Sequence, residues 1–300
     1  MSMTRIAVVG IGAIGGSVAA DLADVGRHEV QLCTRTPIDA LEVTHPTGIS
    51  RARAKVVCDP DDATPVDWVL LTTKAHQSPS AVPWLKKLCT PTTIVAVLQN
   101  GVDHEERIAP LLESGSEVLP VVVQIPAEKL APGKVVQQHP GVLIVASSEA
   151  GREFETLFEG ARTAIKVTDD FVTQAWWKLL NNAAVGGICA LVLRESAVAK
   201  DPEVQAIILA MMAEIMEVAR AEGATLPDDA PQKALGLILK AAPNHWSSIT
   251  VDRREGRQLE WEVRNAVVGA RGRRHGIATP LNDLVTTLLR ASNQGLEQGA

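Results

Sequence analysis

Short apolar runs and segments of helical periodicity alternate through about the first 168 residues. The apolar runs are rich in Val and Ile and nearly continuous, which is typical of strands covered on both faces of a parallel sheet. Strands alternating with helices indicate βαβ units. We expect strands at Ile6–Val9, Glu29–Cys33, Trp68–Thr72, Ile94–Leu98 and Val118–Val123, and helices at Ile14–Val25, Ser80–Leu88 and Glu105–Leu112.

Proline and glycine residues separate further short apolar runs before the pattern changes. We expect these runs to form late strands at the edge of the sheet, with an antiparallel arrangement as one option. They are Lys134–Gln138, Val142–Ala146 and Thr163–Val167.

After the acidic pair Asp169-Asp170 the chain becomes helical in pattern. Acidic residues are favoured at helix starts by capping and by the helix dipole. We expect helices at Glu203–Ala221, Arg257–Arg271 and Leu281–Ala291. The fold class is therefore α/β followed by all-α, with a Rossmann-type dinucleotide-binding domain at 1–168 and a helical substrate and catalytic domain at 169–300.

Composition narrows the classes of function. The net charge is −6, which gives no general reason to expect nucleic acid or an anionic membrane as a partner. No apolar run approaches a membrane span and no signal peptide is evident, so we expect a cytoplasmic protein. The four Cys and seven His are scattered, without metal-ligand spacing. The chain has no Tyr, which excludes carbonyl reductases whose proton donor is a phenol.

The first strand runs directly into a glycine loop of the form G-x-G-x-x-G that opens a helix. Gly10 permits the tight turn, Gly12 lets a pyrophosphate approach the backbone, and Gly15 allows the helix to pack closely on the strand. The helix N-terminus favours the negative charge of the pyrophosphate. We expect a dinucleotide to bind the segment Gly10, Ile11, Gly12, Ala13, Ile14 and Gly15; the alternative is a glycine-rich turn without a ligand.

Three polar residues follow the ends of later strands. Sites that prefer NAD place an acid after the second strand, whereas this chain has Arg35 there. A guanidinium suits a 2′-phosphate, so we expect NADP; the alternative is a solvated surface Arg. Lys74 and Asn100 follow the strands at Trp68–Thr72 and Ile94–Leu98, where ligands of open α/β sheets bind, although ordinary turn chemistry explains either residue alone.

Lys178 and Asn182 lie four residues apart in the first helical segment of the second half. In an α-helix this spacing places an ammonium and an amide on one face. On spacing alone, a surface Lys beside an Asn is the simpler interpretation.

Taken together, the order and spacing of these motifs resemble those of the ketopantoate reductases (2-dehydropantoate 2-reductases). The resemblance covers nearly the whole chain and implies a Rossmann domain joined to a helical domain, as in 6-phosphogluconate dehydrogenase-like proteins, and NADPH-dependent reduction of a 2-oxo acid. It rests on the glycine loop, the strand ending at Lys74, Gln99-Asn100-Gly101, Lys178–Asn182, Ser247-Ser248 followed by Glu260, and Arg273–Pro280.

The resemblance implies a role for each matching residue. Lys178 corresponds to the general acid, and Lys74 to the lysine on the cofactor side. Asn100 and Asn182 correspond to polar residues that hold nicotinamide and substrate. Ser248 and Glu260 correspond to a serine that helps to bind the substrate carboxylate and to a glutamate of the site that orients either Lys178 or the cofactor ribose. An ordinary Lys pKa of about 10.4 keeps such an acid protonated at neutral pH.

Three places depart from the family's pattern, and one of them is Arg194-Glu195-Ser196, which replaces the family's Asn-Gly. Gly186 stands where a second Asn is common, and His245 stands where the family often has Asn. We therefore expect reduction of 2-dehydropantoate or, alternatively, of a different 2-oxo acid; a non-catalytic NADP sensor is the other hypothesis. The basic cluster Arg271–His275 is either a solvated face or a contact for an anionic substrate, and the apolar helices suggest a homodimer.

Overall fold

The computed structural model describes residues 3–52, 54–241 and 246–293. Its internal contacts divide the chain into two compact units, Met1–Phe171 and Val172–Ala300. The division lies three residues beyond the boundary expected after residue 168. Because the arrangement of the two units is not determined, each is described by itself.

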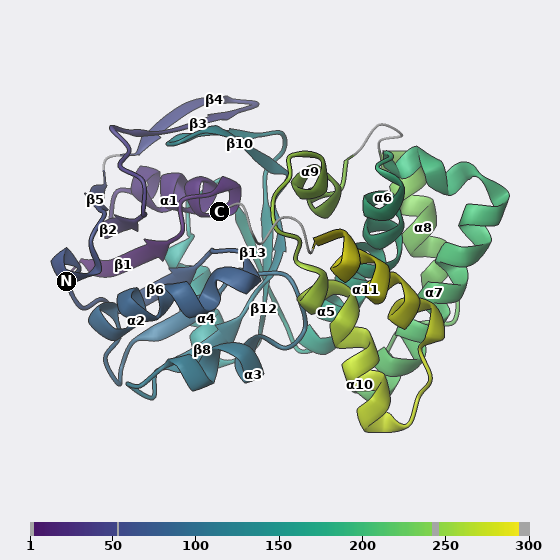
Figure 1. Ribbon diagram of the computed structural model, residues 1–300. Helices are drawn as coiled ribbons and strands as arrows, with labels where there is room; N and C mark the ends of the chain where they lie inside the picture. The colour runs from purple at the N-terminus through teal and green to yellow at the C-terminus, as the bar shows by residue number, and fades with distance from the viewer. Residues whose placement is uncertain (1–2, 53, 242–245, 294–300) are drawn as a thin grey trace. The chain divides into compact units, whose positions relative to one another are not determined.

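Unit 1 is built on a six-stranded parallel sheet (Figure 1). The strand order is β5-β2-β1-β6-β7-β8, so the order reverses beside β1 as in a doubly wound sheet. The strands are β1 (Thr4–Val9), β2 (His28–Cys33), β5 (Lys55–Val57), β6 (Trp68–Leu71), β7 (Ile94–Val97) and β8 (Glu117–Pro120). The expected Rossmann-type class is confirmed.

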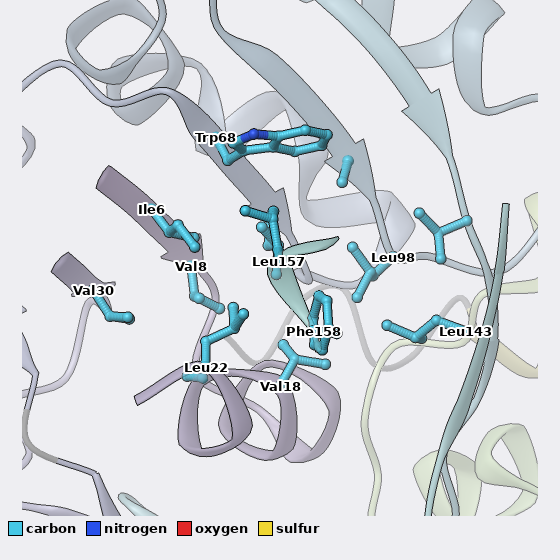
Figure 2. Packing of buried hydrophobic residues seen from close by; sticks show 14 of the residues in the cluster. Ile6, Val8, Val18, Leu22, Val30, Trp68, Leu98, Leu143, Leu157 and Phe158 are labelled. Atoms are coloured by element: carbon cyan, nitrogen blue, oxygen red, sulfur yellow. The ribbon is translucent and has the colours of Figure 1, made fainter. Parts of the chain in front are cut away.

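Helices cover both faces of this sheet. Alternate residues of β1 show why: Ile6 and Val8 pack in one core, and Ala7 and Val9 in the other. The first core contains residues of α1 (Ala13–Val25) and α4 (Glu149–Leu157), and Figure 2 shows Val18, Leu22 and Leu157 around Ile6 and Val8. The second core contains residues of α2 (Val82–Leu88) and α3 (His104–Ile108).

Two smaller sheets correct the expectation of late strands at the edge of the main sheet. One sheet has the order β10-β11-β3-β4 and packs against α1 (Figure 1); its strands are β3 (Leu41–His45), β4 (Gly48–Ala52), β10 (Ala127–Ala131) and β11 (Lys134–Gln137). The other has the order β13-β12-β9, with β9 (Val122–Gln124) antiparallel and β13 (Ala164–Thr168) parallel to β12 (Val142–Ala146). The single strand expected at Val118–Val123 is divided between β8 and β9.

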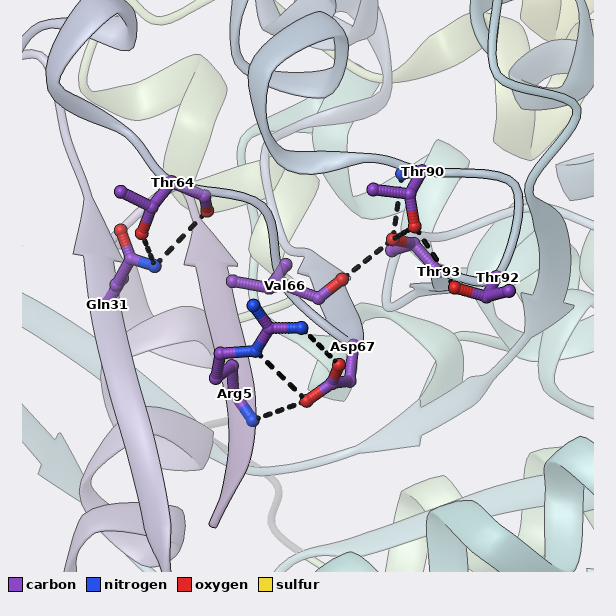
Figure 3. Close-up of polar contacts among 8 residues, drawn as sticks. All are labelled: Arg5, Gln31, Thr64, Val66, Asp67, Thr90, Thr92 and Thr93. Atoms are coloured by element: carbon purple, nitrogen blue, oxygen red, sulfur yellow. Dashed lines mark hydrogen bonds and ion pairs between the residues drawn. The ribbon is translucent and has the colours of Figure 1, made fainter. Parts of the chain in front are cut away.

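Polar contacts tie the strands together at the amino edge of the main sheet (Figure 3). Asp67, just before β6, accepts hydrogen bonds from the backbone N–H of Arg5 at 2.9 Å and from its guanidinium at 2.7 Å. The Thr93 hydroxyl donates to the Val66 carbonyl at 2.7 Å before β7 begins. The starts of β1, β6 and β7 are thus held by side chains, and the carboxyl edge is left for other contacts.

Unit 2 is helical, as expected. It contains α5 (Phe171–Leu180, whose first residue belongs to unit 1), α6 (Gly186–Val192), α7 (Pro202–Ala221), α8 (Ala230–Ala241), α9 (Ser248–Arg254), α10 (Val267–His275) and α11 (Pro280–Asn293). Two π-helical segments, Asn181–Val185 and Glu262–Ala266, precede α6 and α10. The helix expected over Arg257–Arg271 therefore begins later than the sequence suggests.

Among the described residues, no helix has the length and apolar character needed to cross a membrane. Within the same residues, no group of three or more His, Cys, Asp or Glu is arranged to hold a metal ion.

Candidate functional site

The glycine loop lies at the carboxyl end of β1 and has the geometry of a tight turn. Gly10 has φ = 100°, and its N–H donates to the Cys33 carbonyl at 3.0 Å. A Cβ atom at Gly10 would lie 2.8 Å from the Cγ2 atom of Thr73, so both the conformation and the space require glycine.

The next two glycines differ in what surrounds them. A Cβ atom at Gly12 would meet no atom within 4 Å, whereas one at Gly15 would overlap the Gly10 carbonyl oxygen and lie 2.5 Å from the Thr72 hydroxyl. Gly12 is the N-cap of α1 and its first turn has no side-chain cap and no acidic residue. An open backbone at an uncapped helix N-terminus fits the pyrophosphate of a dinucleotide.

The other residues expected on the cofactor side come to the same edge of the sheet. Arg35 follows β2, Lys74 follows β6 and Asn100 follows β7, and all three strands are parallel to β1. Arg35 is exposed, and no described residue forms a hydrogen bond or ion pair with its side chain. Its guanidinium is therefore available to a ligand.

Gln99 joins the loops after β6 and β7, which the sequence pattern does not predict. Its side-chain amide donates to the hydroxyls of Ser78 at 3.0 Å and Thr73 at 3.2 Å. Arg107 donates to the Gln99 side-chain carbonyl at 2.7 Å. The buried network holds the chain on both sides of Lys74 and beside Asn100. In the sequence, this network is indicated only by the position of Gln99 just after an apolar run.

In unit 2, Lys178 lies on α5 and Asn182 on the π-helical segment that follows it. The π-helical segment adds a residue to the turn that begins after Leu180. That Lys178 and Asn182 share one face stays a prediction. Such π segments are frequent at functional sites.

The ionisation of Lys178 also differs from the expectation of an ordinary lysine. Burial lowers its pKa to about 7, and repulsion from Arg264 adds to this lowering, while attraction to Glu260 opposes it. Lys178 is a residue of intermediate solvent exposure. A general acid works best with a pKa near the working pH.

Arg264 and Glu260 are the buried charges near Lys178, and each is 2% exposed. Arg264 lies in the second π-helical segment and donates a hydrogen bond of 2.7 Å to the hydroxyl of Ser248, the first residue of α9. Burial lowers the pKa of Arg264, and attraction to Glu260 and Asp252 opposes that effect. The sequence pointed to Lys178, Glu260 and Ser248 but not to Arg264, four residues after Glu260.

Comparison with known proteins identifies the family. The sequence model described as ketopantoate reductase PanE/ApbA matches residues 6–149, and its C-terminal counterpart matches residues 170–293. The chain belongs to the ketopantoate reductase family. It is therefore an oxidoreductase, and the resemblance seen in the sequence is confirmed.

Relatives within the ketopantoate reductase family match over almost their full lengths. The 2-dehydropantoate 2-reductase of Caulobacter vibrioides is 42% identical over 97% of this chain and 99% of its own length. That of Mycobacterium tuberculosis is 39% identical over 97% of this chain and 99% of its own. A solved PanE/ApbA family ketopantoate reductase from Ralstonia eutropha JMP134 is 27% identical, with a TM-score of 0.88 over 98% of this chain and 99% of that one.

The structure places some departures from the ketopantoate reductase pattern. Gly186 begins α6 beside Arg264, whereas His245 lies outside the described residues. In the basic cluster, Arg271 and His275 both contact Glu222, and Arg273 lies 3.4 Å from Asp283. These partners, Glu222 just after α7 and Asp283 on α11, give the cluster ion pairs within unit 2.

Proposed function

We propose that this protein reduces a 2-oxo acid to a 2-hydroxy acid with NADPH, and that 2-dehydropantoate, reduced to pantoate, is its first candidate substrate. The observation that carries the proposal is the set of Lys178 on α5 with the buried charges of Glu260 and Arg264 acting on it, in a member of this family. Relatives named 2-dehydropantoate 2-reductase at 42% and 39% identity support the choice of substrate.

Lys178 acts as the general acid in this proposal. Bound NADPH supplies a hydride to the ketone carbon. Negative charge then develops on the ketone oxygen, and Lys178 stabilises that charge and donates its proton. Glu260 raises the pKa of Lys178 and so favours its protonated form. Asn182, on the segment after α5, and Ser248 bind the substrate.

The cofactor side lies on unit 1. The uncapped first turn of α1 holds the pyrophosphate through the backbone from Gly10 to Gly15, and Arg35 holds the 2′-phosphate. Lys74 and Asn100, positioned by the Gln99 network, contact the remainder of the dinucleotide.

The direct test is an assay of purified protein with NADPH and a panel of 2-oxo acids that differ in branching and bulk. The proposal expects 2-dehydropantoate to have the highest kcat/KM. A different 2-oxo acid is the second candidate, because Gly186 stands where the family commonly has Asn. If no 2-oxo acid is turned over while NADPH binds, the protein is a sensor and the proposed function is wrong.

The pH dependence of reduction follows from the lowered pKa of Lys178. The acid must be protonated to act, and its proton is lost above pH of about 7. We therefore expect kcat/KM for reduction to fall about tenfold per pH unit above that value. Oxidation of the 2-hydroxy acid, which needs the neutral amine, rises over the same interval. A profile for reduction that stays flat to pH 9 contradicts the lowered pKa.

The Arg35→Ala variant tests the preference for NADPH. Removing a guanidinium from a 2′-phosphate is expected to raise the Kd of NADPH about tenfold, because charge-assisted hydrogen bonds are lost. The Kd of NADH stays within about twofold. Arg51→Ala is the matched control, since Arg51 is another exposed arginine of unit 1 and pairs with Glu42. An unchanged NADPH to NADH ratio refutes the role of Arg35.

A homodimer and a cytoplasmic location remain predictions. Exposed apolar residues on unit 2, Leu284 and Leu288 of α11 among them, support the homodimer. Analytical ultracentrifugation of the purified protein measures its oligomeric state.

A further inference from the structure

Arg264 is a buried cation with few direct contacts to its N–H donors. Its side chain is 2% exposed, and its single hydrogen bond goes to the neutral hydroxyl of Ser248. Its Nε atom is buried without a partner. Among the residues that the structure describes, none forms an ion pair with it.

A buried guanidinium with so few direct contacts is unfavourable unless an anion binds to it. A guanidinium carries five N–H donors and no acceptor, and buried charges in proteins are normally paired. Glu260 and Asp252 attract Arg264 electrostatically. The donors that remain are therefore matched to an acceptor from outside the protein chain.

Gly186 borders the guanidinium. A Cβ atom built there would lie 3.5 Å from the Nη1 atom of Arg264 and 3.6 Å from the Cγ2 atom of Ile249. Because that Cβ atom would already reach van der Waals contact, a longer side chain at 186 would occupy the volume beside Nη1. Ser248, whose hydroxyl accepts the hydrogen bond from the Nη2 atom of Arg264, is an exposed residue.

We propose that Arg264 binds the carboxylate of the 2-oxo acid together with Ser248, and that Gly186 keeps the space beside Nη1 open for it. The inference rests on the proposed function and names the group that selects its substrate class. A carboxylate matches a guanidinium in charge and in bidentate geometry. Its carbon is bonded directly to the ketone carbon, so a carboxylate held by Arg264 also fixes the position of the ketone.

Binding of this carboxylate also changes the pKa of the proton donor, Lys178. Repulsion from Arg264 is one cause of the lowered pKa of Lys178. A bound carboxylate offsets the charge of Arg264, so the pKa of Lys178 rises in the complex. The lysine is then protonated when a substrate with a carboxylate is present.

The experiment compares Arg264→Met, Arg264→Lys and the wild type. The probe is oxamate, a carboxylate of 2-oxo acid shape that is not reduced, titrated calorimetrically into the protein with NADPH. We expect Arg264→Met to raise both the Kd of oxamate and the KM for the substrate about 30-fold, since hydrogen bonds to a charged group are lost. Arg264→Lys recovers part of this affinity because it restores the charge. Arg273→Met, at an exposed arginine of α10, is the control and leaves both constants unchanged.

Two further measurements separate binding from a structural role. Arg264→Met also removes the cation that attracts the buried Glu260 and Asp252, so Tm alone does not separate binding from a structural role. The fall of kcat/KM with pH moves to higher pH in Arg264→Met, because the repulsion acting on Lys178 is removed. Wild-type enzyme also prefers a 2-oxo acid over its methyl ester, and Arg264→Met loses this preference.

The outcomes distinguish the inference from the proposed function. Oxamate binding that depends on Arg264 supports the inference even if no 2-oxo acid is turned over, in which case the proposed function alone fails. Turnover of 2-oxo acids with equal KM and equal oxamate affinity in Arg264→Met overturns the inference and leaves the proposed function standing.

Discussion

The Lys178→Ala variant is expected to slow the reduction of its substrate at least ~100-fold at saturation, because general acid catalysis contributes about 10²–10⁴-fold. NADPH binding should survive, since the glycine loop and Arg35 belong to unit 1 and Lys178 to unit 2. Loss of the charge by itself should not lower Tm, because the lowered pKa means that the native state disfavours the charged lysine. Single-turnover kinetics with NADPH fluorescence measure the chemical step and cofactor binding together.

Lys233→Ala is the matched control for this variant. Lys233 lies on α8 of the same unit and pairs with Asp229 at the surface, so its removal should leave kcat unchanged. The loss in Lys178→Ala should also be greatest near and below pH 7, where the wild-type lysine carries its proton. Equal activity of Lys178→Ala and wild type would remove Lys178 from the mechanism.

The parallel sheet could be predicted from sequence because burial on both faces leaves a strong local signal. The runs at Ile6–Val9 and Ile94–Leu98 are apolar without interruption, and the structure places them in β1 and β7. The strands β3, β4 and β10 were missed because one face of each carries polar or charged residues, as in Ala127–Ala131. Their pairing is set by tertiary contacts with α1 and β11, which no local pattern contains.

The helical half was predictable in class but not in detail. A long amphipathic helix such as α7 has a strong periodic signal and a capping Asp201 that accepts hydrogen bonds from Glu203 and Val204 N–H groups. The π-helical segments have no such signal, because one extra residue in a turn is decided by packing. Asn265 shows this, since its side-chain amide donates to the Ala183 carbonyl at 2.9 Å and joins the two segments.

Part of the candidate site could likewise be predicted from the sequence, and part could not. The glycine loop could be predicted because each glycine answers a backbone requirement, and the structure bears this out at Gly10 and Gly15. The lowered pKa of Lys178 could not be predicted, because burial and the charge of Arg264 arise only in the folded chain. Arg264 itself looks in sequence like an ordinary helix-surface arginine, and only its burial separates it from one.

Paired substitutions at Gly12 and Gly15 should separate cofactor binding from folding. At Gly15 a Cβ atom would overlap the Gly10 carbonyl, so Gly15→Ala forces α1 away from β1 and is expected to destabilise unit 1 by about 3 kcal/mol or more. At Gly12 a Cβ atom meets nothing, and φ is −93°, so Gly12→Ala should fold with an unchanged Tm.

The same Gly12→Ala variant is nevertheless expected to weaken NADPH binding by more than ~100-fold. Its methyl group would stand at the open helix N-terminus where the pyrophosphate approaches, and the loss of two charge-assisted N–H hydrogen bonds costs at least about 3 kcal/mol. Thermal unfolding without and with NADPH measures both properties in one experiment, since a bound ligand raises Tm by mass action. Gly12→Ala should match the wild type without NADPH and lose the Tm increase with it, whereas Gly15→Ala should already unfold at lower temperature alone. If NADPH raises the Tm of Gly12→Ala as much as that of the wild type, the dinucleotide does not bind at this loop.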